Sequence, residues 1–149
     1  MGAFAGAQSV AESNDATLDR MFDLNFRSTF HMIRAVLPAM RAQGGAGIVA
    51  IGSPTAIEPQ PMLAAYTASK AALVSLIRTV ALENKDKNIS ANVILPGTME
   101  TPANRAASPG ADYCKWVQPC QVASLLVHLA SERASQLTGA VIPFYGGEL

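Results

Sequence analysis

The sequence predicts an α/β fold in which helices cover a parallel β-sheet. Short apolar runs alternate along the chain with longer segments whose apolar residues recur every three or four positions. The short runs are typical of buried strands, and the longer segments are typical of helices. Strands that alternate with helices lie parallel in one sheet, because each helix carries the chain back to the same end of the sheet.

The composition is that of one globular domain, residues 1–149. Half of the residues are hydrophobic and 15% are charged, which is enough apolar material to bury a core. Acidic and basic residues balance, so we expect neither nucleic acid nor an anionic membrane as a partner. No apolar run is long enough to cross a bilayer. The first residues do not resemble a signal peptide, so a cytoplasmic location is expected.

The first element is expected to be a loop over residues 1–15, followed by a helix from Ala16 to Gln43 with Asp15 as its N-cap. Pro38 should kink or end this helix. Asn25 interrupts the apolar face of the helix. It is either part of a site or a core amide whose hydrogen bonds are satisfied internally.

The glycine-rich segment 44–47 follows a helix, whereas a dinucleotide-binding turn follows a strand, so we interpret it as a helix C-cap and turn. Ile48 to Ile51 is expected to be a short buried strand, with Ser53 just after its carboxyl end. Residues 54–62 hold three prolines and are expected to be loop. A second helix is expected from Leu63 to Asn84.

The second strand is expected from Asn92 to Leu95, ended by Pro96-Gly97. Residues 98–118 show no period and are expected to form a long loop, and long loops in compact domains usually have a function. A third helix is expected over residues 119–131 and a last strand over residues 140–145. A proline inside that strand favours an edge position, because it cannot donate a ladder hydrogen bond.

Tyr66 and Lys70 are the strongest candidates for catalysis. They lie four residues apart at the start of the second predicted helix and therefore share a face. An ammonium beside a phenol favours the phenolate, so we expect Lys70 to lower the tyrosine pKa from about 10. A phenol tuned in this way can donate and accept protons near neutral pH.

The surroundings of this pair strengthen the hypothesis, because such a pair also arises by chance. Ser53 and the Pro96-Gly97 turn both follow strands, and ligands of parallel sheets bind at the carboxyl ends of the strands. The alternative for Ser53 is a hydroxyl that only forms a turn. The two histidines and two cysteines lack metal-ligand spacing, so no metal site is expected.

The order and spacing of these residues resemble the short-chain dehydrogenase/reductase family over nearly the whole chain. The matching segments are Asn25 in Asp-Leu-Asn-Phe, Ser53 in Ile-Gly-Ser, Tyr66-xxx-Lys70, Leu95 to Thr101, Thr138-Gly139 and Gly146-Gly147. The resemblance implies the C-terminal portion of a Rossmann-type doubly wound parallel sheet. It also implies hydride transfer between NAD or NADP and a small carbonyl or alcohol substrate.

The same resemblance implies a role for each matching residue. Tyr66 would be the general acid/base, and Lys70 would lower its pKa and bind the nicotinamide ribose. Ser53 would hydrogen-bond the substrate oxygen, and Asn25 would support a water-linked proton relay. The nicotinamide side would be lined by Pro96, Gly97, Thr98, Met99 and Thr101. Residues 98–118 would be the substrate loop, with Tyr113 and Trp116 in a lid.

Two departures from the family pattern matter. The family's glycine-rich turn after a first strand has no counterpart here, so we expect a β-α-β-α-β half of about 60–80 residues to be missing. That half would hold the pyrophosphate site and the acid that selects NAD over NADP. Strand 48–51 would then be an open apolar edge. The segment 2–6 instead resembles the loop after the family's fourth strand.

The second departure concerns the substrate. Residues 101–105, with Tyr113 and Trp116, resemble the loop of dihydropteridine-reductase-like members, which usually lack the serine found here as Ser53. We therefore expect a carbonyl reductase of the 3-oxoacyl-carrier-protein reductase type, working as a homodimer or homotetramer, and keep a pteridine reductase as an alternative. A rival hypothesis is a catalytically silent, truncated relative that acts by association through the small-residue face of residues 63–84.

Overall fold

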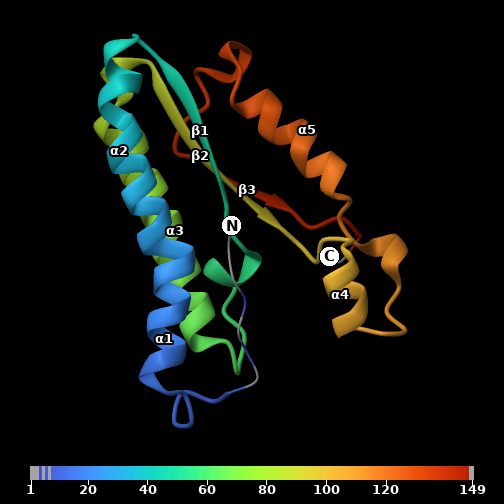
Figure 1. Ribbon diagram of the computed structural model, residues 1–149. Helices are drawn as coiled ribbons and strands as arrows, with labels where there is room; N and C mark the ends of the chain where they lie inside the picture. The colour runs from blue at the N-terminus through green and yellow to red at the C-terminus, as the bar shows by residue number, and fades with distance from the viewer. Residues whose placement is uncertain (1–3, 5, 7, 148–149) are drawn as a thin grey trace.

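Three parallel strands form the sheet at the centre of the fold, in the order β1-β2-β3. The structure is a computed structural model that describes residues 4, 6 and 8–147. The strands are β1 (Ala46–Ile51), β2 (Ile89–Pro96) and β3 (Val141–Phe144). Both strand pairs are parallel, which confirms the predicted sheet (Figure 1).

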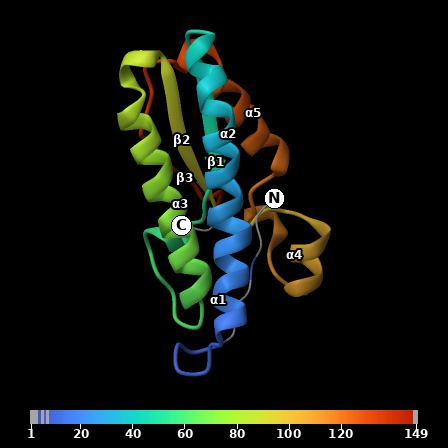
Figure 2. The same cartoon turned by 60° about the vertical axis from the view of Figure 1, so that its left-hand side comes forward.

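Helices cover both faces of this sheet (Figures 1 and 2). On one face, α1, the π-helical turn η1 and α2 make one continuous rod that packs beside α3, and α5 covers the other face. The longer elements are α1 (Asp15–Phe22), η1 (Asp23–Arg27), α2 (Ser28–Ala42), α3 (Ala64–Glu83), α4 (Pro102–Ala107) and α5 (Pro119–Leu129). The 3-10 turns are η2 (Pro54–Ala56), η3 (Lys85–Lys87), η4 (Tyr113–Lys115) and η5 (Glu132–Ala134).

Strand β2 is the centre of the core and is buried along its whole length. Successive side chains of a strand point to opposite faces of the sheet. Val93 and Leu95 accordingly pack with Ile77 of α3, whereas Ile94 packs with Leu129 of α5. The apolar run recognised in the sequence is therefore a strand covered on both sides.

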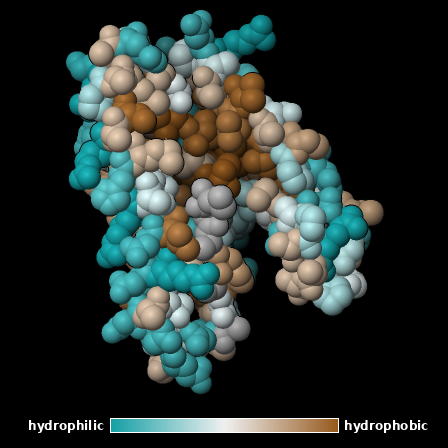
Figure 3. Space-filling model, viewed as in Figure 1, coloured by the Kyte–Doolittle hydropathy of each residue, from teal (hydrophilic) through white to brown (hydrophobic). Residues whose placement is uncertain are grey.

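Strand β1 was expected to be buried, but all six of its residues are only half-buried. In the described part of the chain it pairs with β2 alone, so its other edge has no strand beside it. Figure 3 shows a strongly hydrophobic patch over the region where Figure 1 draws β1 and β2. These observations confirm the open apolar edge, and β3 confirms the predicted edge position of the proline-containing strand.

The first helix differs from its prediction in two details. Its N-cap is Asn14, whose side chain accepts a hydrogen bond from the N–H of Thr17 at 2.8 Å, so the assignment of Asp15 as the cap is wrong. The π-helical turn η1 was not foreseen. The end of α2 at Ala42 agrees with the predicted end at Gln43, so the helix continues past Pro38. Pro38 is exposed, so water can reach the carbonyl that loses its helical partner.

The segment 98–118 is not a plain loop, because it contains the short helix α4 and the turn η4. An isolated parallel bridge between Met99 and Val117 holds its two ends together. The segment 2–6, with its resemblance to a family loop, lies outside the described residues except for Phe4 and Gly6. Among the described residues, no helix is both long and apolar enough to cross a membrane.

Candidate active site

The side chain of Lys70 ties the start of α3 to the end of β1. Its Nζ donates a hydrogen bond to the carbonyl oxygen of Ile51 at 3.1 Å, and the residue is only 6% exposed. The same Nζ lies 5.9 Å from the centre of the Tyr66 ring, one helical turn away. Lysine and tyrosine therefore share one face of α3, as their spacing predicted, and lie next to the carboxyl end of β1.

Ser53 lies where β1 ends, and its position depends on the glycine before it. A Cβ atom on Gly52 would come within 2.5 Å of the buried Leu95 side chain, so the two strands approach closely only because this residue has no side chain. The hydroxyl of Ser53 is within 3.0 Å of the hydroxyl of Thr55, which the sequence interpretation missed. Both residues are buried.

Tyr66 is half-buried, and its ring packs edge-to-face against Phe4 with 5.0 Å between ring centres. Burial raises the pKa of Tyr66 above its ordinary value, and a hydrogen bond with Ser53 lowers it by a smaller amount. The expectation that Lys70 sets a lowered tyrosine pKa is therefore wrong. Desolvation dominates instead, and it also lowers the pKa of Lys70 itself.

The raised pKa of Tyr66 determines its protonation state. A phenol whose pKa lies above about 10 is protonated at neutral pH. Tyr66 is therefore in the state from which it can donate a proton, with the hydroxyl of Ser53 beside it.

Asn25 lies on the π-helical turn η1 and is 2% exposed. Its Nδ2 donates a hydrogen bond to the Oγ of Ser69 at 3.1 Å, across the interface between the first helical rod and α3. Ser69 precedes Lys70 and donates in turn to the carbonyl of Tyr66 at 2.7 Å. The sequence interpretation missed Ser69. The available signal was its place between the tyrosine and the lysine on a helix start otherwise made of small residues.

The turn after β2 lies at the same edge of the sheet as Ser53. The N–H of Gly97 donates to the carbonyl of Phe144 at 3.1 Å, and the carbonyl of Thr98 accepts from the N–H of Val117 at 2.9 Å. These bonds fix the segment that begins at Pro96 between β3 and the end of the 98–118 loop.

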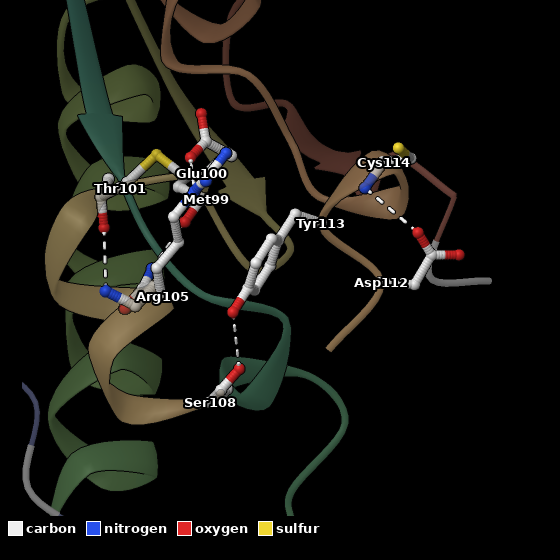
Figure 4. Close-up of polar contacts among 9 residues, drawn as sticks. Met99, Glu100, Thr101, Arg105, Ser108, Asp112, Tyr113 and Cys114 are labelled. Atoms are coloured by element: carbon white, nitrogen blue, oxygen red, sulfur yellow. Dashed lines mark hydrogen bonds and ion pairs between the residues drawn. The ribbon is translucent and has the colours of Figure 1, made fainter. Parts of the chain in front are cut away.

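The next residues stabilise α4 rather than leaving their polar groups free. Thr101 is the N-cap of α4 and accepts from the N–H of Asn104 at 3.2 Å. The side chain of Asn104 donates to the carbonyl of Met99 at 2.7 Å. The hydroxyl of Thr101 is thus committed to the helix end, as Figure 4 shows.

Tyr113 is the outer residue of the expected lid and Trp116 the inner one. Their rings lie 4.7 Å apart, and Trp116 is buried. The guanidinium of Arg105 lies 4.7 Å from the centre of the Tyr113 ring, whose hydroxyl donates to the carbonyl of Ser108 (Figure 4). In Figure 3 an open notch separates the part of the molecule where Figure 1 draws α4 from the lower ends of α1 and α3. The structure therefore gathers Asn25, Ser53, Tyr66 and Lys70, whereas Tyr113 and Trp116 pack against each other beside Arg105 of α4.

No group of three or more histidine, cysteine, aspartate or glutamate side chains in the described part of the chain could hold a metal ion. Both cysteines are free thiols at the surface.

Comparisons with known proteins agree with this fold. The family model described as short chain dehydrogenase matches residues 2–112. The chain is 31% identical to D-beta-hydroxybutyrate dehydrogenase of Rhizobium meliloti (strain 1021), a match that covers 96% of this chain and 64% of the relative.

Two solved structures are similar in fold and in sequence. A 3-ketoacyl-(acyl-carrier-protein) reductase from Brucella melitensis, complexed with NADH, has a TM-score of 0.86 at 26% identity, and the match covers 99% of this chain and 64% of that one. An NADPH-bound short chain oxidoreductase from Pseudomonas aeruginosa PAO1, described as having an atypical catalytic center, has a TM-score of 0.88 at 27% identity, with coverage of 100% and 63%. The chain thus spans less than two thirds of the length of these proteins. With a model that matches most of its residues and a curated relative above 30% identity, the chain belongs to the short chain dehydrogenase family.

Proposed function

We propose that this chain carries the proton-transfer site of an NAD- or NADP-dependent oxidoreductase that interconverts a carbonyl and an alcohol. The observation that carries the proposal is the meeting of Ser53, Tyr66 and Lys70 at the carboxyl edge of the sheet. The NADH- and NADPH-bound relatives support the choice of cofactor.

The residues present fit the nicotinamide end of such a cofactor. An ammonium group has three N–H donors, and Lys70 uses one of them in its hydrogen bond to Ile51. The remaining donors would bind the ribose hydroxyls next to the nicotinamide ring. The turn formed by Pro96, Gly97, Thr98, Met99 and Thr101 would line the ring itself.

The bound cofactor would supply or accept the hydride. In the direction of reduction, Tyr66 would donate its phenolic proton to the carbonyl oxygen of the substrate. Ser53 would hold that oxygen by a hydrogen bond, and the positive charge of Lys70 would stabilise the phenolate that remains. Asn25 would help to return a proton to Tyr66 through water.

A 3-oxoacyl compound is the proposed substrate class, paired with the corresponding 3-hydroxyacyl compound. The names of the Rhizobium and Brucella relatives support this choice, because both describe chemistry at the third carbon of an acyl chain. These relatives give no support to the dihydropteridine alternative. A homodimeric or homotetrameric assembly and a cytoplasmic location belong to the same proposal.

The test is oxidation of NADPH or NADH by the purified chain, followed by the absorbance of the reduced nicotinamide, with a 3-oxoacyl thioester as substrate. The proposal expects oxidation that depends on the thioester and saturates with it. A quinonoid dihydropterin serves as the comparison substrate and is expected to react more slowly. No substrate-dependent oxidation with either cofactor would contradict the proposal.

A second candidate, a catalytically silent relative that acts by association, is favoured by the open edge of β1 and the apolar surface over it. Calorimetric titration with NADH and NADPH separates the two candidates. Saturable binding by residues 1–149 would count against the silent relative. Absence of binding, together with a concentration-dependent increase in molecular mass, would favour it.

A further inference from the structure

The side chain of Ser69 links Asn25 and Tyr66, two residues of the proposed proton-transfer site. Its residue is 0% exposed, in the second turn of α3. Its hydroxyl donates to the carbonyl oxygen of Tyr66 at 2.7 Å and accepts from Nδ2 of Asn25 at 3.1 Å. It therefore bridges α3 and the helical rod that carries η1, which lie side by side in Figures 1 and 2.

The direction of these two bonds follows from the chemistry of a hydroxyl group. A serine has one O–H donor and two acceptor lone pairs. A carbonyl can only accept, so the proton of Ser69 goes to Tyr66, and only lone pairs face Asn25. The amide of Asn25 must then present its NH₂ group to Ser69 and turn its Oδ1 away. Ser69 thus selects one of the two orientations of a buried amide.

Asn25 lies on a π-helical turn where the first helical rod contacts α3. In η1 the N–H of Ser28 bonds to the carbonyl of Asp23, five residues earlier, instead of the four typical of an α-helix. Such a turn inserts one residue and changes the direction of the side chains after it. π-Helical turns of this kind are frequent at functional sites. Asn25, within this turn, is the polar residue that contacts Ser69.

We propose that Ser69 is a positioning residue that couples the orientation of Asn25 to the first turn of α3, and thereby to Tyr66 and Lys70. Ser69 lies three residues after the tyrosine and directly before the lysine. A displacement of its hydroxyl therefore moves the backbone that carries both groups. The proposal rests on the proposed function, and it adds a residue that supports the reacting groups without contacting the substrate.

The test compares Ser69→Ala with Ser75→Ala, which makes the same chemical change on an exposed residue of the same helix. For Ser69→Ala, kcat should fall by about tenfold, as expected for loss of a buried hydrogen bond in a coupled network. Ser75→Ala should behave like the parent. Equal kcat values for Ser69→Ala and Ser75→Ala would overturn the proposal.

A double-variant cycle with Asn25→Leu tests the coupling between Ser69 and Asn25. Leucine is chosen because it is close to asparagine in shape. If Ser69 acts through Asn25, the loss of kcat in the double variant should equal the larger single loss. Losses that multiply would overturn the coupling. Where Ser69→Ala does not fold, Ser69→Cys and Ser75→Cys replace the alanine pair, because a thiol is close to a hydroxyl in size but is only a weak donor and acceptor.

A readout that needs no activity keeps this proposal separate from the proposed function. The side-chain NH₂ signals of Asn25, followed by NMR in ¹⁵N-labelled protein, should shift in Ser69→Ala and stay in place in Ser75→Ala. An inactive parent whose Asn25 signals respond to Ser69→Ala would contradict the proposed function and support the coupling. Signals that do not respond would overturn the coupling whether or not the parent is active.

Discussion

The Nζ of Lys70 donates a hydrogen bond to the carbonyl of Ile51 at 3.1 Å, so a charged group from α3 is anchored to the last residue of β1. The two residues are 19 positions apart, and the segment between them contains Ser53 and, at the start of α3, Tyr66. One hydrogen bond therefore closes the loop that carries the serine and brings the tyrosine to the strand end.

Replacing this lysine should change how stability depends on pH. Burial lowers the pKa of Lys70, so between that pKa and about 10.5 the unfolded chain binds more protons than the folded chain. The folded chain is stabilised above the pKa that Lys70 has in the unfolded chain. This stabilisation is lost as pH falls through the lower pKa that Lys70 has in the folded chain. The parent should therefore gain stability relative to Lys70→Met as pH rises through this window, as measured by urea unfolding. Lys85→Met, at an exposed lysine, is the control. If the free energy of unfolding depends on pH in the same way in Lys70→Met and in the parent, the lysine is not buried.

The rate of carbonyl reduction should depend on the protonated form of Tyr66. Its pKa is raised by burial, so the phenol stays protonated up to at least about pH 10. We expect no loss of kcat from this group near neutral pH and a fall only above its pKa. Oxidation of the alcohol needs the phenolate and should rise over the same range. A fall in reduction between about pH 6 and 8, assigned to Tyr66, would contradict the raised pKa.

Ser53→Ala should affect both the rate and its pH dependence. The variant removes a hydrogen bond that lowers the pKa of Tyr66, so the alkaline fall in reduction should move to higher pH. It also removes a donor for the substrate oxygen, so kcat should fall by about 10²-fold. Thr55→Ser keeps a hydroxyl beside Ser53 and serves as the control. If the fall in the reduction rate at alkaline pH occurs at the same pH in Ser53→Ala and in the parent, the serine does not affect the pKa of Tyr66.

The two neighbouring capping candidates of α1 give a direct test of the fold. Asn14→Ala should lower the free energy of unfolding by about 0.5–2 kcal/mol, because the N–H of Thr17 loses its acceptor. Asp15→Ala should cost less, because Asp15 contributes only its charge near the helix N-terminus. The measurement is urea denaturation of both variants. The opposite ranking would restore Asp15 as the cap.

Most of the architecture was predictable because it depends on residue periodicity. The apolar strand 92–95 and the helical spacing of residues 63–84 both correspond to observed elements, β2 and α3. The positions of Ser53 and Pro96-Gly97 at strand ends follow from the same pattern. The π-helical turn was not predictable in this way, because one inserted residue barely disturbs a pattern of three- and four-residue spacings. The short helix α4 is likewise too brief to show a period.

The positions of the candidate site residues were more predictable than their pKa values. The spacing of Tyr66 and Lys70 placed them on one helix face, but only the structure shows how deeply each is buried. Burial and a neighbouring charge shift a tyrosine pKa in opposite directions, and residue types alone do not decide between them. Ser69 was missed for a similar reason, since a serine in a helix start made of small residues does not reveal its partner.

The central claim is that Tyr66 donates the proton, and the most direct test is kcat for Tyr66→Phe in the reduction assay. Tyr145→Phe makes the same change at a tyrosine outside the proposed site, where the lost hydroxyl donates to Glu58. Loss of general acid catalysis should lower kcat of Tyr66→Phe by about 10²–10⁴-fold and leave Tyr145→Phe close to the parent. Reduction that survives Tyr66→Phe unchanged would contradict the account.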